Sequence, residues 1–465
     1  MRLAKFILAS TALALAAAPA AAQQKNVINT ATDLPPVVIE LPAKPSELAV
    51  QGGANLEKLE DAIAAYVADV NQNYEVRDAA TQRQLLGLQL QDAIVDNRWD
   101  EALALQERIR ASEDKPATKA MSGLLGGAYI RAAKAVGEDS PQFAERFEAE
   151  LRQAVQALDW SLTQDALQAM RAQYQLISRD LIIGSLQGSL DANAAAQGNK
   201  VGVGIASAVL GTHRTLTEVL PLKDRIFRVL DARVKSETAE KEDRWTPRLV
   251  TLTPAQVKAP VIVGVWDGGL DPAVFQGQLW TNAKETANGK DDDGNGFVDD
   301  VHGVAFNPDW KPATSDLRPM PAEDMKDIAG NLKMAKGSLD LQAAVDSPEA
   351  AALRQRISTL KPQDVTAFSL QQARVGLYLH GTATGWTSVV GNPGARAMNA
   401  RFDYHITPVP VPMDEKVAEN FAAYAEQKVD YLKKNGARVV NMSWRITEPQ
   451  IATMLAAAEP DVEKR

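Results

Sequence analysis

Two residues in the second half of the chain, Asp267 and His380, have the types and neighbours expected at a site of proton transfer. Asp267 ends the run Val263-Gly-Val-Trp-Asp267 and is followed by two glycines, which let the backbone turn without a side-chain clash. His380 begins the segment His380-Gly-Thr-Ala-Thr-Gly385, whose small residues allow close packing while the imidazole faces a cleft. Taken singly, each segment is also typical of a simple turn, after a strand or before a helix.

An alternation of strands and helices would position these side chains. The run Pro260–Trp266 is apolar and β-branched, as a buried parallel strand is, and sites of open α/β sheets form at the carboxyl ends of strands. His380 is expected to open a helix. Further strands and helices are expected, in turn, at Tyr404–Val411, Lys416–Lys434, Ala437–Ser443 and Pro449–Glu459. This order predicts a parallel α/β sheet with right-handed crossovers.

Four motifs in this order resemble the subtilase family of serine peptidases. The first two are the strand end at Asp267 and the His-Gly-Thr segment at His380. The third, Val439-Val-Asn-Met-Ser-Trp444, is similar to the family's strand whose edge pairs with substrate backbone. The fourth, Asn288–Gly303, is similar to a loop of many long subtilases. The resemblance covers residues 258–465 and implies a truncated subtilisin-like domain, an incomplete parallel α/β sheet that follows a mostly helical N-terminal domain.

The resemblance implies a role for each matching residue. Asp267 would orient the imidazole, and His380 would take the proton of a serine nucleophile and return it to the leaving amine. The strand with Asn441, Ser443 and Trp444 would bind an extended polypeptide substrate as an added strand. An ordinary buried strand is the alternative for that segment. The implied activity is hydrolysis of peptide bonds by a secreted serine endopeptidase.

The sequence also departs from the family pattern. It contains no Gly-Thr-Ser-x-Ala-x-Pro segment; the last serine is Ser443, and no asparagine follows Asn441 to donate to an oxyanion. Ala383 replaces a second histidine, Gly268 replaces a Thr or Ser, and a segment covering about residues 308–371 is inserted. We therefore expect the chain to be inactive alone. It is either a truncated peptidase, which we favour, or a non-catalytic pseudoprotease that binds peptides.

An acidic loop predicts a structural calcium site. Its residues follow the order of a calcium-binding loop at positions 1, 3, 5, 7 and 9, namely Asp291, Asp293, Asn295, the Phe297 carbonyl and Asp299. Hard oxygen ligands suit calcium, and Gly296 permits the sharp turn. Position 12 is His302 and not glutamate, so the loop is no EF-hand, and Asp300 is a candidate to replace that ligand. A metal-free Asp/Asn/Gly-rich turn is the alternative.

The first half of the chain is predicted to be an all-α domain of unknown role, over residues 55–245. Apolar residues recur there at helical spacing, and glycine and proline are sparse. The first helix is expected from Leu56 onward. Six further helices are expected at Gln82–Asp96, Trp99–Ala111, Ala117–Val136, Gln142–Leu158, Leu162–Ile183 and Glu218–Ser236. Its one histidine, His213, has no catalytic partner in the sequence and is expected to be structural. Residues 23–54 are rich in proline and are predicted to be a linker.

The N-terminus and the composition indicate the compartment. Residues 1–22 combine Arg2 and Lys5 with a short apolar core and small residues before Gln23, the pattern of a secretory signal peptide. We expect export to the periplasm or the exterior, with no membrane span after signal removal. The net charge of −9 argues against nucleic-acid partners, and the lack of cysteine excludes disulfides, a thiol nucleophile and thiolate zinc sites.

Overall fold

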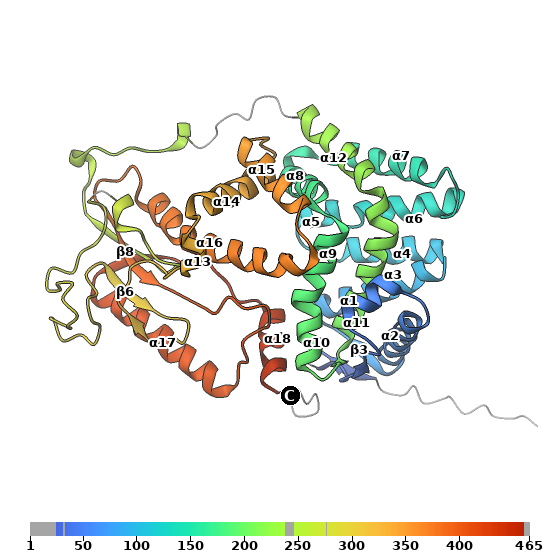
Figure 1. The fold of residues 1–465 in the computed structure, drawn as a ribbon, viewed down its shortest axis with the longest axis horizontal. Helices are drawn as coiled ribbons and strands as arrows, with labels where there is room; N and C mark the ends of the chain where they lie inside the picture. Colours follow the sequence, from blue (N-terminus) through green and yellow to red (C-terminus); the bar gives the residue numbers. More distant parts are fainter. Residues whose placement is uncertain (1–24, 31–32, 238–245, 276, 460–465) are drawn as a thin grey trace, which may run out of the picture.

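The computed structural model describes residues 25–30, 33–237, 246–275 and 277–459 (Figure 1). The predicted signal peptide, residues 1–22, lies outside the described residues. The chain forms a helical N-terminal part and a C-terminal part with a small mixed sheet, and the two lie side by side (Figure 1). This confirms the prediction of an α-helical half followed by a half that mixes helices and strands.

Helices make up most of the N-terminal part, because apolar residues recur along them at the spacing of one helix face. In the second helix these include Leu56, Leu59 and Ile63, all buried. Asp78 and Asp159 accept hydrogen bonds from backbone N–H groups at the starts of α3 and α8. The helices are α2 (Ala54–Asn73), α3 (Ala79–Val95), α4 (Trp99–Ala111), α5 (Pro116–Met121), α6 (Leu124–Val136), α7 (Phe143–Gln156), α8 (Trp160–Leu176), α9 (Arg179–Leu186), α10 (Ala192–Ala196), α11 (Val203–Arg214) and α12 (Lys223–Glu237), with π-helical turns η2 (Gln187–Asp191) and η3 (Thr215–Val219).

Residues 26–30 and 33–51 belong to this helical part and do not form a linker, which corrects the prediction for this part of residues 23–54. Ile28, Leu48 and Ala49 are buried in one apolar core with α2 and α11. Short strands in this region pair with others farther along the chain, β1 with β3 in parallel and β2 with β4 antiparallel. These elements are β1 (Asn26–Ile28), β2 (Ile39–Glu40), α1 (Pro45–Gln51), β3 (Tyr74–Val76) and β4 (Lys200–Val201).

The C-terminal part contains a five-stranded sheet with the order β7-β6-β8-β5-β9. Strand β7 is antiparallel to β6, and the other four strands are parallel, so the sheet is mixed and not wholly parallel as predicted. The strands are β5 (Val261–Val265), β6 (Gly303–Phe306), β7 (Pro312–Ala313), β8 (Ala395–Arg401) and β9 (Ala437–Asn441). The helices are α13 (Ala322–Met325), α14 (Ile328–Gln342), α15 (Pro348–Ser358), α16 (Pro362–Val389), α17 (Glu415–Lys434) and α18 (Glu448–Ala458).

The strand after α16 lies earlier in the chain than the sequence predicted. Strand β8 pairs with both β5 and β6, whereas residues 404–411 form no strand. Pro408 and Pro410 have no backbone N–H to donate to a sheet, which explains why that segment forms a loop. Strand β8 is hard to predict because it contains alanine and arginine in place of β-branched residues.

Strand β9 is the edge of the sheet and is open to solvent. Its neighbouring residues Val439 and Val440 are 53% and 42% exposed. Adjacent residues of a strand point to opposite faces, so neither face of β9 is covered here. Strand β9 therefore forms an exposed edge of the sheet among the described residues.

The inserted segment, residues 308–371, joins the two parts of the molecule. Its helices α14 and α15 pack against α8, and the start of α16 packs against α9. Ala172 of α8 shares an apolar cluster with Leu341, Leu353 and Val365 of the insertion. Residues far apart in the sequence thus form one apolar interface.

Two glycines bring the helical part unusually close to α16. A Cβ at Gly184 would lie 2.5 Å from the Pro362 carbonyl oxygen and 2.5 Å from Cγ2 of Val365. A Cβ at Gly188, in turn η2, would lie 2.0 Å from Oγ1 of Thr366. The helices can pack at this distance only because both positions lack a side chain.

Candidate active site and metal site

Asp267 and His380 are in contact, although they lie far apart in the sequence. Asp267 follows the carboxyl end of β5 and its side chain is 3% exposed, whereas His380 comes from α16 and its side chain is 48% exposed. Nδ1 of His380 is 2.7 Å from Oδ1 of Asp267. When Nδ1 carries the proton, the imidazole donates to the carboxylate, and Nε2 is left to interact with a ligand.

Hydrogen bonds hold Asp267 in place. Its Oδ1 accepts from the Gly268 N–H at 2.7 Å, and its Oδ2 accepts from Oγ1 of Thr384 at 3.2 Å. Its backbone carbonyl accepts from the Phe402 N–H at 2.6 Å. Because the carboxylate is buried and bonded on both oxygens, it offers His380 a fixed acceptor.

Helix α16 carries His380 well inside its length and not at its start, which corrects the sequence prediction. The small residues after His380 serve close packing and not a helix start. A Cβ at Gly381 would lie 2.3 Å from the Gly269 carbonyl oxygen. One residue further, Oγ1 of Thr382 accepts from the Asp271 N–H at 3.0 Å. Helix α16 therefore rests directly on the turn that follows β5.

A cleft of about 1480 Å³ opens beside Asp267 and His380. Its walls come from α14 and α16, from the loop 404–413 and from residues 443–454, and Asn193 of the helical part also contributes. Most of the wall is apolar. The cleft is large enough for several residues of an extended chain, and the exposed imidazole lies on its wall.

The predicted substrate-binding residues divide between the cleft and the sheet. Ser443 and Trp444 line the cleft, whereas Asn441 does not. The Asn441 carbonyl accepts from the Trp266 N–H at 2.9 Å, and its side-chain oxygen accepts from Oγ of Ser443 at 3.1 Å. The Trp444 ring stacks on Phe402, with ring centroids 4.8 Å apart.

A buried lysine supports the strand end beside this site. Lys428 of α17 is fully buried and donates to the carbonyls of Ala400 and Arg401 and to the Tyr424 hydroxyl, at 3.1, 2.7 and 2.5 Å. Its Nζ lies 4.9 Å from the ring centroid of Trp266. Burial, aided by the Arg401 charge, holds the pKa of Lys428 well below its usual range. Lys428 thus fixes the carboxyl end of β8.

Two of the predicted calcium ligands, Asp299 and Asn295, form hydrogen bonds within the acidic loop. Oδ1 of Asp299 accepts from the backbone N–H groups of residues 288–289, both at 2.9 Å, so this carboxylate closes the loop. The Asn295 amide accepts from the Phe297 N–H at 2.8 Å and donates to Asp300 at 2.9 Å. Asp299 and Asn295 are therefore engaged in loop hydrogen bonds, and Asp299 is not one of the three acidic residues that converge among the described residues.

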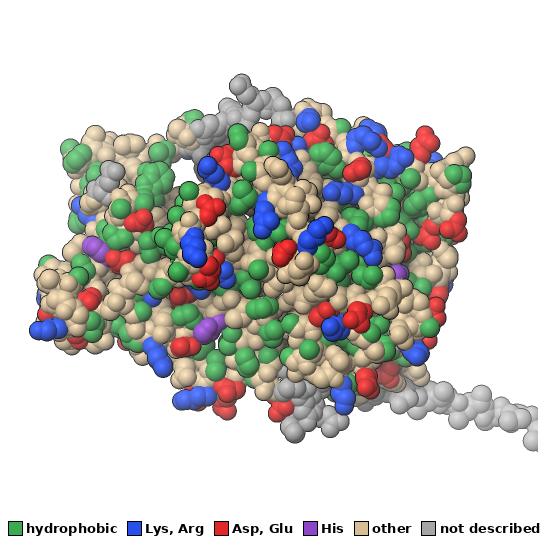
Figure 2. Space-filling model, viewed as in Figure 1, with side chains coloured by type: hydrophobic (Ala, Val, Ile, Leu, Met, Phe, Trp, Pro, Cys, Tyr) green, Lys and Arg blue, Asp and Glu red, His purple; other side chains and the backbone are tan. Residues whose placement is uncertain are grey.

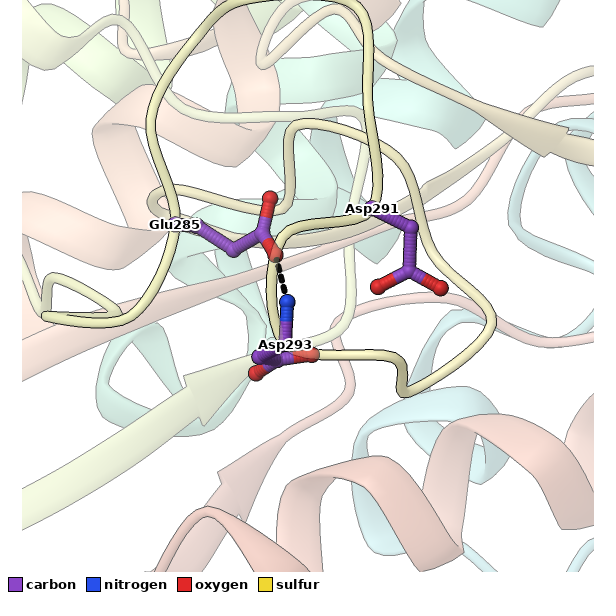
Figure 3. Close-up of side chains that lie close together, drawn as sticks. All are labelled: Glu285, Asp291 and Asp293. Atoms are coloured by element: carbon purple, nitrogen blue, oxygen red, sulfur yellow. Dashed lines mark hydrogen bonds between the residues drawn. The ribbon is translucent and has the colours of Figure 1, made fainter.

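Asp291 and Asp293 are grouped instead with Glu285, which the sequence prediction had not included. One carboxylate oxygen of each lies within 4.8 Å of the others, and the three side chains point toward one another (Figure 3). Glu285 is 7% exposed; its Oε1 accepts from the Asp293 N–H at 2.9 Å, but its buried Oε2 has no hydrogen-bond partner. A buried carboxylate oxygen without a partner fits a cation at this position.

Sequence reasoning missed Thr384, Glu285 and Lys428. Thr384 lies four residues after His380, so helical spacing alone could have placed it beside the same carboxylate. Lys428 stands between Tyr424 and Tyr431 on the buried face of an amphipathic helix, a signal of a buried charge. Glu285 had no comparable signal, because its approach to the loop depends on tertiary folding.

Comparisons of this chain with protein-family models, with curated proteins and with solved structures found no match. Across the described parts of the chain, no helix is long and apolar enough to cross a membrane.

Proposed function

We propose that residues 258–465 form part of a subtilisin-like peptidase site, in an exported protein, that binds an extended polypeptide beside Asp267 and His380. The observation that carries this proposal is the 2.7 Å contact between Nδ1 of His380 and Oδ1 of Asp267 on the wall of an apolar cleft. A buried carboxylate that orients an exposed imidazole is the acid–base arrangement of serine peptidases.

In this site Asp267 keeps His380 in the tautomer with Nδ1 protonated, so that Nε2 can accept a proton from a nucleophile and pass it to the leaving amine. Among the residues that the structure describes, no side-chain hydroxyl is hydrogen-bonded to His380, and Ser443 donates to Asn441. We therefore propose that the chain as given binds polypeptides without cutting them, either as one portion of a serine endopeptidase or as a pseudoprotease.

The edge strand β9 supports the binding of an extended chain. Its outer side is unpaired in the sheet, so its backbone groups are available to another strand. Ser443 and Trp444 follow β9 directly and line the cleft. A polypeptide added to β9 would therefore be led toward the imidazole of His380.

We expect a bound peptide to protect His380 from carbethoxylation by diethyl pyrocarbonate, because it would cover the exposed imidazole. His213 lies in the helical part, with Nδ1 2.9 Å from the Ala49 carbonyl, and should react at an unchanged rate. Mass spectrometry of the digested protein would measure both rates in the presence and absence of a short apolar peptide. Equal reaction of His380 in both samples would argue against the proposed site.

We also expect a fluorophosphonate probe, which reacts with activated serines, to leave this chain unlabelled. The reason is that no hydroxyl is hydrogen-bonded to His380 in the described residues. Labelling or peptide hydrolysis would show that the chain is competent. Any hydrolysis should then fall about 10⁴-fold in Asp267→Asn if this dyad drives it.

A second candidate function of the same part is calcium binding by the acidic loop. We propose Glu285, Asp291 and Asp293 as the ligands, because they converge and because Oε2 of Glu285 is buried without a partner. Three carboxylates this close repel one another, and a divalent cation would offset that repulsion. Calcium would fix the loop that leads into β6.

Calcium should raise the melting temperature, and Glu285→Gln should abolish the rise. Binding to the folded state alone stabilises it by about 2.7 kcal/mol when free calcium is 100 times Kd. Asp299→Asn is the matched control, because Asp299 is an acidic residue of the same loop that is not one of the three converging residues. Differential scanning calorimetry with calcium or chelator would measure the response. A response lost in Asp299→Asn but kept in Glu285→Gln would favour the ligand order predicted from the sequence.

A further inference from the structure

The two acidic groups that line the described part of the cleft are each hydrogen-bonded to a histidine. Asp267 is 3% exposed and contacts His380, so it is closed to a ligand. Asp309 is 62% exposed, and its Oδ1 lies 3.0 Å from Nε2 of His405. The described residues supply no other carboxylate to the cleft.

Two cationic side chains on the same wall are not matched. Lys311 and Arg445 line the cleft, both are exposed, and neither forms an ion pair with any residue that the structure describes. The whole chain carries a net charge of −9. Acidic and basic side chains are interspersed over the face drawn in Figure 2. With neutral histidines, two acidic and two basic side chains line the described cleft, and this even balance differs from the net negative charge of the chain.

The rest of the wall adds apolar surface. Leu339 of α14 lines the cleft and is 66% exposed, and Trp444, Phe421 and Met413 line it as well. The cleft therefore offers two unpaired cations among apolar contacts, and its complement is an apolar ligand that carries negative charge.

We infer that the cleft selects polypeptide segments that carry acidic side chains among apolar residues, with Lys311 and Arg445 as the residues that determine this preference. The inference rests on the proposed function, since it names the substrate class of the same cleft. Carboxylates of the segment pair with the two cations, and its apolar side chains cover Leu339. Exposed ion pairs are weak, so each cation should change affinity about 1.4- to 5-fold.

The test is isothermal titration calorimetry of the full chain with three short capped peptides that share one apolar sequence and differ only in carrying Glu, Gln or Lys. We expect the Glu peptide to bind most tightly and the Lys peptide most weakly. The difference between them should shrink as salt is added, because exposed ion pairs are screened. The salt series uses the unaltered protein and so does not depend on any variant folding.

The double variant Lys311→Glu/Arg445→Glu should reverse the order of the Glu and Lys peptides and leave the Gln peptide nearly unchanged. Lys434→Glu is the control, because Lys434 is an exposed cation on α17 that does not line the cleft. Equal binding of all three peptides would overturn the inference and leave the peptide site intact. Failure of every peptide to bind would overturn the proposed function itself.

Discussion

Gly381→Ala should break the contact between Asp267 and His380 and destabilise the C-terminal part. The new Cβ would lie 2.3 Å from the Gly269 carbonyl oxygen and 2.7 Å from the Gly269 nitrogen. Both are backbone atoms of the turn after β5, so α16 must move away. Overpacking of this kind costs about 1–3 kcal/mol. Urea unfolding would measure the cost, and the NMR signal of the His380 Nδ1 proton would report the broken contact.

Gly376→Ala is the matched control for this prediction. Gly376 lies on the same helix, is exposed, and would have no atom within 4 Å of a new Cβ. Alanine is favoured over glycine inside a helix by about 1 kcal/mol, so this variant should be slightly stabilised. A Gly381→Ala protein as stable as Gly376→Ala, with an unchanged Nδ1 signal, would show that α16 can shift without disturbing the dyad.

The pairing of Asp267 with His380 was accessible to sequence reasoning because each residue lies in a short local motif. The strand before Asp267 was identified by its β-branched residues, and β5 forms there. The position of His380 in the middle of a helix was not identified, because the small residues that follow it suggest a helix start. Their actual role, close contact with Gly269, depends on a residue more than a hundred positions away. Motifs that act through tertiary contacts cannot be interpreted from local spacing alone.

The same limit applies to the proposed metal ligands and to the insertion. The acidic loop was identified from its composition, but Glu285 joins it through folding, and Asp299 is used by the loop itself. The insertion was predicted at about residues 308–371, and α14, α15 and the start of α16 form there. What no local pattern indicated is that they pack on α8 and α9, since that interface combines residues such as Ala172 and Leu353.

Gly184→Ala should separate the helical part from α16. Its new Cβ would lie 2.5 Å from the Pro362 carbonyl oxygen, so α9 and α16 could no longer pack at their present distance. The apolar cluster that includes Leu341 and Leu353 would open, and binding of a hydrophobic dye should rise. Hydrogen exchange should become faster in the first turns of α16. Gly87→Ala, in α3, is the control, because nothing lies within 4 Å of its Cβ and the added methyl should be tolerated.

The faster hydrogen exchange caused by Gly184→Ala should not extend along α16 as far as His380. Between the two lies Arg374, which pairs with the buried Asp324 of α13 at 2.5 and 3.1 Å. This ion pair holds the middle of α16 against α13 in the C-terminal part, and breaking a buried ion pair lowers the free energy of unfolding. We therefore expect faster exchange before Arg374 and unchanged exchange around His380. Faster exchange around His380 as well would mean that α16 moves as one rigid rod, and that docking of the helical part controls the geometry of the dyad.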